Sequence, residues 1–63
     1  MTCIVLNTQT NQTDLWTSND VARVFNDYTE PVLDIEPVDS NDVNEGMMFS
    51  HNSVLHEVVE VLN

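Results

Sequence analysis

Apolar residues recur with a strand-like pattern at the start of the chain. Residues 2–8 open with a β-branched, apolar run, and residues 14–16 form a second short apolar run. The segment between them is polar and contains no helix or strand breaker, and Asn11 lies near its centre. This pattern predicts two strands joined by a turn near Asn11, which together make a β-hairpin.

The next stretch carries the signature of an amphipathic helix. Thr17 is followed three residues later by Asp20, which matches a capping box at a helix N-terminus. The apolar residues that follow are spaced as one helical face, namely Val21, Val24, Phe25 and Tyr28. We expect Trp16, Phe25 and Tyr28 to lie in the core, and the helix to end at Glu30, because the residue before Pro31 is pushed out of the helical region.

Residues 32–37 alternate between two faces and predict a half-buried strand. Leu33 and Ile35 occupy one face, and Val32, Asp34 and Glu36 the other. The flanking prolines place this strand at a sheet edge. Residues 38–45 predict an acidic, Asn-rich loop, and residues 46–49 a further short strand.

The last segment, residues 54–62, fits two interpretations. Its apolar residues repeat as a helical stripe, and Asn52 or Ser53 can cap a helix that begins there. Its high valine content favours a strand instead. Because the adjacent Val58 and Val59 break strict alternation, we expect a helix and keep the strand as the alternative.

Together these elements predict the α+β class: a small compact single domain over residues 1–63, with a short antiparallel sheet and two helices in the order β-β-α-β-loop-α. A chain of this size buries only about 60% of its unfolded surface. Cys3 is the only cysteine, so no internal disulfide can form, and we expect it to be a small core residue. We therefore expect a homodimer whose seam is the terminal stripe of Val54, Leu55, Val58, Val59 and Leu62.

Charge points to the class of partner. The chain has 11 acidic residues and one basic residue, Arg23, for a formal net charge of -10. One acidic band has no basic residue within it, and comprises Asp27, Glu30, Asp34, Glu36, Asp39, Asp42 and Glu45. Direct nucleic-acid binding is excluded, because it needs Lys and Arg to neutralise phosphates, and an anionic membrane surface would repel the chain. We expect a basic protein partner that contacts this band together with Met48 and Phe49. The other interpretation of residues 47–49 is core packing or a self-association seam.

The sequence contains no clear catalytic or metal-binding motif. Residues 39–46 partly resemble a calcium-binding loop, but Val43 stands at the fifth ligand position, and Asn44 stands where the loop needs a glycine for its sharp turn. Cys3, His51 and His56 lack the paired spacing of a structural zinc site. No nucleophile has an evident base or a Gly-rich turn to stabilise an oxyanion. We therefore expect no enzymatic activity, no cofactor and no metal.

In size, acidity and lack of a catalytic set, the chain resembles the small acidic proteins with which bacteriophages and mobile elements block restriction, CRISPR or other host nucleic-acid enzymes. This resemblance covers composition, and implies a DNA-mimicking inhibitor that occupies a basic groove. The alternatives are a small regulatory or antitoxin-like subunit that binds through an apolar surface, and a structural or assembly protein. The free cysteine and the lack of a targeting or membrane segment indicate a cytoplasmic location, in the host bacterium if the chain is phage-encoded.

Overall fold

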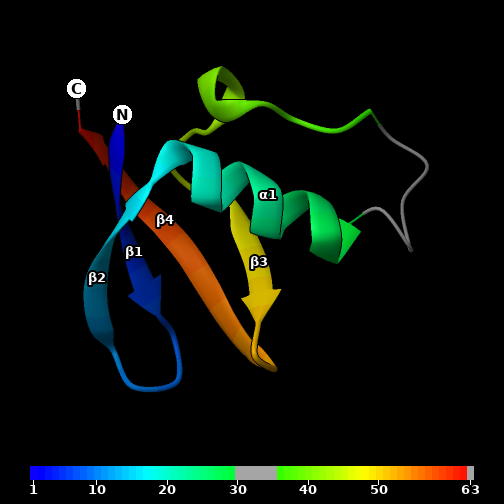
Figure 1. Ribbon diagram of the computed structural model, residues 1–63. Helices are drawn as coiled ribbons and strands as arrows, with labels where there is room; N and C mark the ends of the chain where they lie inside the picture. The colour runs from blue at the N-terminus through cyan, green and yellow to red at the C-terminus, as the bar shows by residue number, and fades with distance from the viewer. Residues whose placement is uncertain (30–35, 63) are drawn as a thin grey trace.

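The computed structural model describes residues 1–29 and 36–62, in which a helix crosses one face of a four-stranded antiparallel sheet (Figure 1). The strands lie in the order β2-β1-β4-β3. Along the chain, the elements are β1 (Thr2–Asn7), β2 (Gln12–Thr17), α1 (Ser18–Thr29), the single 3-10 turn η1 (Ser40–Asp42), β3 (Met48–His51) and β4 (Val54–Leu62). The predicted α+β class is confirmed.

The N-terminal hairpin forms as predicted. β1 and β2 pair without a register shift from Thr2 opposite Thr17 to Asn7 opposite Gln12. Asn11 adopts a left-handed conformation with φ of 62°, which asparagine tolerates better than most residues. Its amide N–H donates to the Asn7 carbonyl at 2.8 Å and closes the turn.

Helix α1 begins at the predicted cap, because the Thr17 hydroxyl accepts from the Asp20 amide at 3.1 Å. The Asp20 carboxylate does not return to the cap and instead pairs with Arg23 at 3.0 Å. The expected burial of Tyr28 is wrong, since that side chain is 44% exposed. The other three residues of the predicted stripe, Val21, Val24 and Phe25, are in the core or packed against it, as expected.

The loop after α1 is attached to the helix by one side chain. The Asn26 amide donates to the Val38 carbonyl at 2.8 Å, and the Val38 amide donates to Asn26 Oδ1 at 2.9 Å. These two hydrogen bonds fix the start of the predicted acidic loop, which contains η1. The strand expected over residues 32–37 lies mostly outside the described residues, and Glu36 and Pro37 are not part of a strand.

The expected C-terminal helix is wrong, because residues 54–62 form strand β4. Asn52 and Ser53, expected as helix caps, form a two-residue hairpin turn with φ of 53° and 64°. Positive φ at both central residues is the signature of the turn that best fits the twist of a hairpin. The described residues therefore contain one α-helix where two helices were expected, since η1 is a single 3-10 turn.

A β-bulge explains why the alternation in β4 breaks. Ile4 of β1 pairs with Glu60, but the next residue, Val5, pairs with Val58. Val59 therefore has no partner and is the extra residue of the bulge. The two adjacent valines suggested a helical period. In the strand, Val58 pairs with Val5, and Val59 is left unpaired at the bulge.

The core lies between α1 and the sheet. Its buried apolar members are Cys3, Val5, Val21, Ala22, Val43, Phe49 and Val58. The prediction that Cys3 is a small core residue is confirmed. Both termini lie at the same end of the sheet, where Thr2 pairs with Leu62 (Figure 1). Within the described residues, no helix has the length and apolar character needed to cross a membrane.

Candidate functional site

The sheet has one covered face and one open face, and this division is set by strand register. Cys3, Val5 and Val58 point to the helix side and are buried. Their neighbours Ile4 and Leu6 must point to the other face, because successive side chains of a strand alternate. Apart from the bulge, each cross-strand pair shares a face, so the pairings assign the other strands in the same way.

The open face is apolar with two acidic residues set into it. Its central residues are Ile4, Leu6, Leu15, Met48, Leu55, Glu57 and Glu60. Leu15 is 70% exposed and Leu55 is 42% exposed, values unlike those of buried aliphatic side chains. Glu57 stands between Leu6 and Met48, and Glu60 stands beside Ile4. A partner on this face therefore meets apolar surface and carboxylates together.

A second feature is an aromatic cluster at the helix-covered face. The rings of Trp16, Phe49, His51 and His56 have neighbouring centroids 5.3–5.9 Å apart. His56 stacks on Phe49 with an interplanar angle of 6°. Its Nδ1 lies 2.8 Å from the Val54 carbonyl, which can only accept, so Nδ1 carries the proton.

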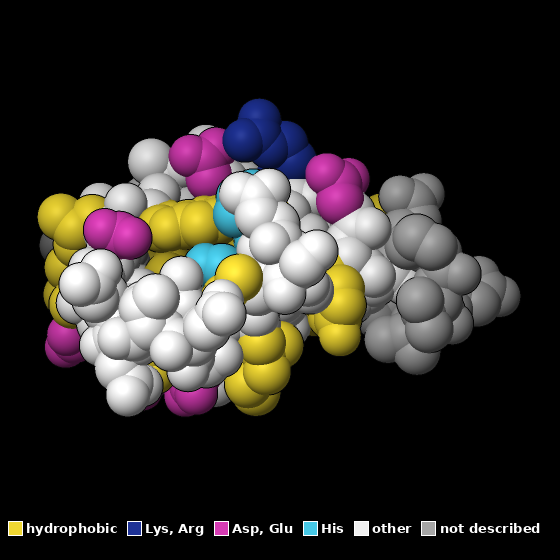
Figure 2. Space-filling view, turned by 90° about the horizontal axis from the view of Figure 1, so that it is seen from below, with side chains coloured by type: hydrophobic (Ala, Val, Ile, Leu, Met, Phe, Trp, Pro, Cys, Tyr) yellow, Lys and Arg dark blue, Asp and Glu magenta, His cyan; other side chains and the backbone are white. Residues whose placement is uncertain are grey.

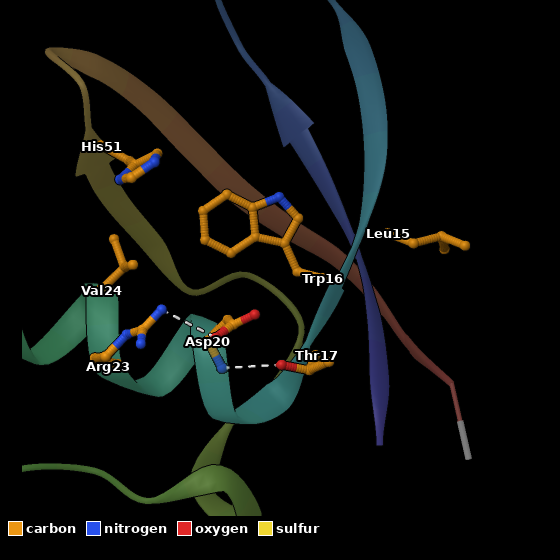
Figure 3. A pocket seen from close by; sticks show the side chains of 7 residues that line it. All are labelled: Leu15, Trp16, Thr17, Asp20, Arg23, Val24 and His51. Atoms are coloured by element: carbon orange, nitrogen blue, oxygen red, sulfur yellow. Dashed lines mark hydrogen bonds and ion pairs between the residues drawn. The ribbon is translucent and has the colours of Figure 1, made fainter.

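This cluster borders an open pocket of about 340 Å³ between β2, β3 and α1. The Trp16 and His51 rings line it, Arg23 and Asp20 form their ion pair at its rim, and Leu15 points away toward the other face (Figure 3). In the space-filling view, histidine side chains lie in a hollow beside hydrophobic ones (Figure 2). This pocket was not predicted from the sequence, because its residues come from three separate elements.

The pocket offers a surface that a ligand could contact, but the nearby groups that could act as a base or a nucleophile are hydrogen-bonded or buried. His51 Nε2 lies 3.3 Å from the Asn52 side-chain amide, which donates, so this nitrogen is occupied as an acceptor. The Cys3 thiol is buried in the core, and that burial raises its pKa against a smaller opposing effect of the amino terminus. In the described parts of the chain, no three His, Cys, Asp or Glu side chains converge as metal ligands.

The structure disperses the predicted acidic band over two elements. Asp27 lies on the exposed side of α1, and the loop exposes Glu36, Asp39, Asp42 and Glu45. Glu30 and Asp34 lie outside the described residues, so the predicted pairing of Asp34 with Glu36 on one strand face has no structural description. Acidic side chains in Figure 2 stand apart around the molecule and form no single patch on the face in view.

Two members of the band are engaged with the backbone of η1. Asp39 Oδ1 accepts from the Asn41 amide at 2.8 Å, and Asp42 Oδ2 accepts from the Asp39 amide at 3.1 Å. These reciprocal contacts form a capping box that holds the two carboxylates on one turn. Substitution of either residue would therefore change the loop structure as well as its charge.

The remaining predicted contact residues divide between surface and core. Met48 lies on the open face and is exposed, whereas Phe49 is 0% exposed and belongs to the core. The expected dimer stripe also divides: Val54 and Val58 face the helix side, Leu55 and Leu62 face the open side, and Val59 is the bulge residue. No continuous seam of these five residues exists on the strand.

The apolar character of Ile4 and Leu6 was the one sequence signal for the open face. Residues 2–6 are apolar at four consecutive positions, which is typical of a strand covered on both faces. Only one face is covered by α1 in the part of the chain that the structure describes. Comparison with known proteins adds no relative, since no family model, no curated protein and no solved structure matches the chain.

Proposed function

We propose that this protein is a non-enzymatic, acidic interaction protein that binds the basic, nucleic-acid-binding surface of a host enzyme or defence protein. The observation that carries the proposal is the open sheet face, where Glu57 and Glu60 stand among uncovered apolar side chains. No Lys or Arg belongs to this face, because Arg23, the only basic residue of the chain, lies on α1. Its complement is an apolar surface that bears Lys or Arg.

Charge argues against a second copy as the occupant of this face. Stacking two copies face to face would bring together Glu57 and Glu60 from each, with no basic residue to compensate them. Removing such carboxylates from water without a partner is costly. A partner with positive side chains supplies the missing counter-charge, and the apolar contacts around the glutamates exclude water from the resulting ion pairs.

The exposed acidic loop has a different part in this proposal. Glu36, Asp39, Asp42 and Glu45 add to the formal charge of -10, which accelerates encounter with a basic surface over several ångströms of solution. Long-range attraction changes the association rate more than the lifetime of a complex. We therefore assign steering to the loop, and close contact to the open face.

The test compares two double variants with the same change in charge. One carries Glu57→Lys and Glu60→Lys on the open face, and the other carries Glu36→Lys and Glu45→Lys on the loop. The four side chains make no hydrogen bond or ion pair among those recorded for the described residues. A partner captured from bacterial lysate with the wild-type chain is identified by mass spectrometry and purified, and its binding kinetics are measured by surface plasmon resonance.

We expect the face variant to shorten the lifetime of the complex by about tenfold or more, and the loop variant chiefly to slow association. Loss of lifetime confined to the loop variant would move the contact to the acidic band and contradict the proposal. Equal effects of both variants would reduce the role of acidity to net charge. Unchanged binding by both would remove the electrostatic basis altogether.

A second candidate is a small regulatory or antitoxin-like subunit that binds through the apolar surface without imitating DNA. The exposure of Leu15, Met48 and Leu55 favours it. Saturating duplex DNA separates the two, because it displaces a protein from a nucleic-acid groove but leaves an apolar regulatory contact intact. Light scattering tests the third alternative, an assembly protein, through the size of the particles.

The proposal also places the protein in the cytoplasm as a homodimer. The free, buried Cys3 is compatible with a reducing compartment. A chain of 63 residues has a small core, and association of two copies would add to its buried apolar surface. The expected seam along the terminal stripe does not exist as one surface, so a homodimer needs a different contact.

A further inference from the structure

The outer edge of β2 is a free sheet edge in the described part of the chain. β2 is the first strand in the order β2-β1-β4-β3 and pairs on one side, with β1. β3, at the other edge, is only four residues long and packs against α1. β2 is six residues long and exposed along its whole length except at Trp16, which is half-buried.

β2 has few of the features that normally protect an edge strand. Proteins block such edges with Pro, with charged side chains, Lys above all, or with a bulge that twists the strand away. Residues 12–17 contain neither Pro nor Lys, the β1–β2 register has no shift, and Asp14 is the only charged residue of the strand. Leu15, at the middle of this edge, is 70% exposed, more than any other large apolar side chain of the described residues.

The distribution of charge identifies the occupant of this edge. Residues 1–19 contain a single carboxylate, Asp14, whereas the other ten acidic residues lie between Asp20 and Glu60. A basic partner therefore finds little to attract it at this hairpin. A second copy of the chain meets the least self-repulsion here.

We propose that the outer edge of β2 pairs antiparallel with β2 of a second copy, centred on Leu15, so that two four-stranded sheets become one continuous sheet. This contact rests on the homodimer of the proposed function and gives it an interface at the strand edge. It is tested without the basic partner, so its failure leaves the open-face contact untouched. The two-fold axis stands perpendicular to the sheet, and a C2 contact of this kind is self-complementary.

The pairing register follows from side-chain direction and charge. Directly opposed residues share a face of the sheet, so a two-fold axis must pass beside one residue and its own copy. Centring on Leu15 sets Leu15 against Leu15, Thr13 against Thr17 and Asp14 against Trp16 of the other copy. Centring on Asp14 would set two carboxylates directly opposite each other, which is destabilising.

The first test is the mass of the particle in solution, measured by analytical ultracentrifugation. The wild-type chain of 7.2 kDa is expected at twice that mass at micromolar concentration. Leu15→Asp places two like charges opposite each other at the edge and is expected to weaken the dimer by at least about tenfold. Leu55→Asp is the matched control, because it adds the same charge to the same face in a central strand, and it should leave the dimer intact.

The results separate the possible interfaces. A wild-type monomer at hundreds of micromolar, or a Leu15→Asp dimer of undiminished affinity, would overturn the proposal. Dissociation by Leu55→Asp alone would replace it with face-to-face stacking. Circular dichroism shows whether each variant remains folded, and the next measurement does not require dissociation.

The second test is disulfide trapping, which measures the register directly. Directly opposed residues of an antiparallel pair have Cα atoms about 4.5–5.5 Å apart, within the range that a disulfide bridges. Leu15→Cys is therefore expected to cross-link two copies on mild oxidation. Asp14→Cys should not, because its copy is offset by two residues and lies about 7–8 Å away. The buried Cys3 leaves the wild-type chain as an uncross-linked reference. Preferential cross-linking of Asp14→Cys, or of neither variant, would refute the Leu15-centred pairing.

Discussion

Deletion of one of the two adjacent valines in β4 tests the bulge. Removing either Val58 or Val59 produces the same sequence, in which Glu-Val-Glu-Val alternates strictly between polar and apolar residues. The structure already pairs Val5 with Val58 and Ile4 with Glu60, so the shortened strand can keep both pairs without moving a side chain to the wrong face. A helix would respond differently, because a deletion would rotate every later residue by about 100°.

The expected cost of this deletion is small. Val59 is 36% exposed, so the deletion removes roughly two thirds of the burial of one valine, or about 1 kcal/mol. Regular pairing across the former bulge offsets this loss by about 0.5–1.5 kcal/mol for each backbone hydrogen bond gained. We therefore expect the free energy of unfolding to change by no more than about 1 kcal/mol.

Deletion of Leu55 is the control, because Leu55 is about as exposed as Val59 but lies in the same strand outside residues 57–60, where loss of the bulge can absorb a deletion. Without Leu55, His56 moves to the open face and Glu57 takes its place beside the buried Phe49. The resulting loss should approach the whole stability of a chain of this length, about 3–9 kcal/mol. Urea unfolding followed by Trp16 fluorescence and circular dichroism measures both variants. Equal destabilisation by the two deletions would refute the bulge.

Three further predictions concern charge, the helix-to-loop contact and the core thiol. The melting temperature should rise with sodium chloride, because screening relieves repulsion within a chain of charge -10, and a falling value would show that attractive pairs dominate. Asn26→Ala should cost about 1–3 kcal/mol and accelerate hydrogen exchange at the Val38 amide, whereas unchanged exchange would mean that other contacts hold the loop. Burial raises the pKa of Cys3, so only the unfolded thiol ionises just above pH 9.0; stability should fall from there until pH passes the folded pKa, and Cys3→Ala should show a smaller slope against pH.

The elements predicted correctly are those whose signals are local. Thr17 caps α1 through a hydrogen bond to Asp20, three residues away, and the pattern of such residues is visible in the sequence. The turn at Asn11 likewise depends on the conformational tolerance of one residue. The helix and the first hairpin could be predicted for this reason.

The errors concern contacts between distant segments. The bulge at Val59 exists only because β4 pairs with β1, more than 50 residues earlier, and nothing within residues 54–62 specifies that partner. Phe49 was named as a partner contact because it follows an acidic loop, with core packing as its other interpretation, and its place in β3 turns it toward the helix and into the core.

The acidic composition indicates the kind of partner that we propose, a basic protein, but it does not indicate which residues contact that partner. Excess acidity indicates a basic partner wherever the carboxylates lie, because net charge acts over distance. The close contact depends instead on which carboxylates stand beside uncovered apolar residues, and this follows from the strand register. Glu57 and Glu60 are three residues apart, so in a regular strand their side chains would point to opposite faces. The bulge at Val59 puts both on the open face. The segment that was wrongly expected to be a helix therefore provides both carboxylates of the candidate site.

The geometry of the proposed dimer bears directly on the proposed function. Face-to-face stacking would bury the open face and make it unavailable to any other protein. Edge pairing about an axis perpendicular to the sheet leaves the open faces of both copies on the same side, next to each other. A basic partner with two matching sites would then bind both copies at once, and its avidity would exceed the affinity of one face. Leu15→Asp should therefore weaken binding to a bivalent target more than binding to a monovalent fragment of that target. Leu15 belongs to the open face, so the substitution affects both complexes, whereas loss of the dimer affects only the bivalent one.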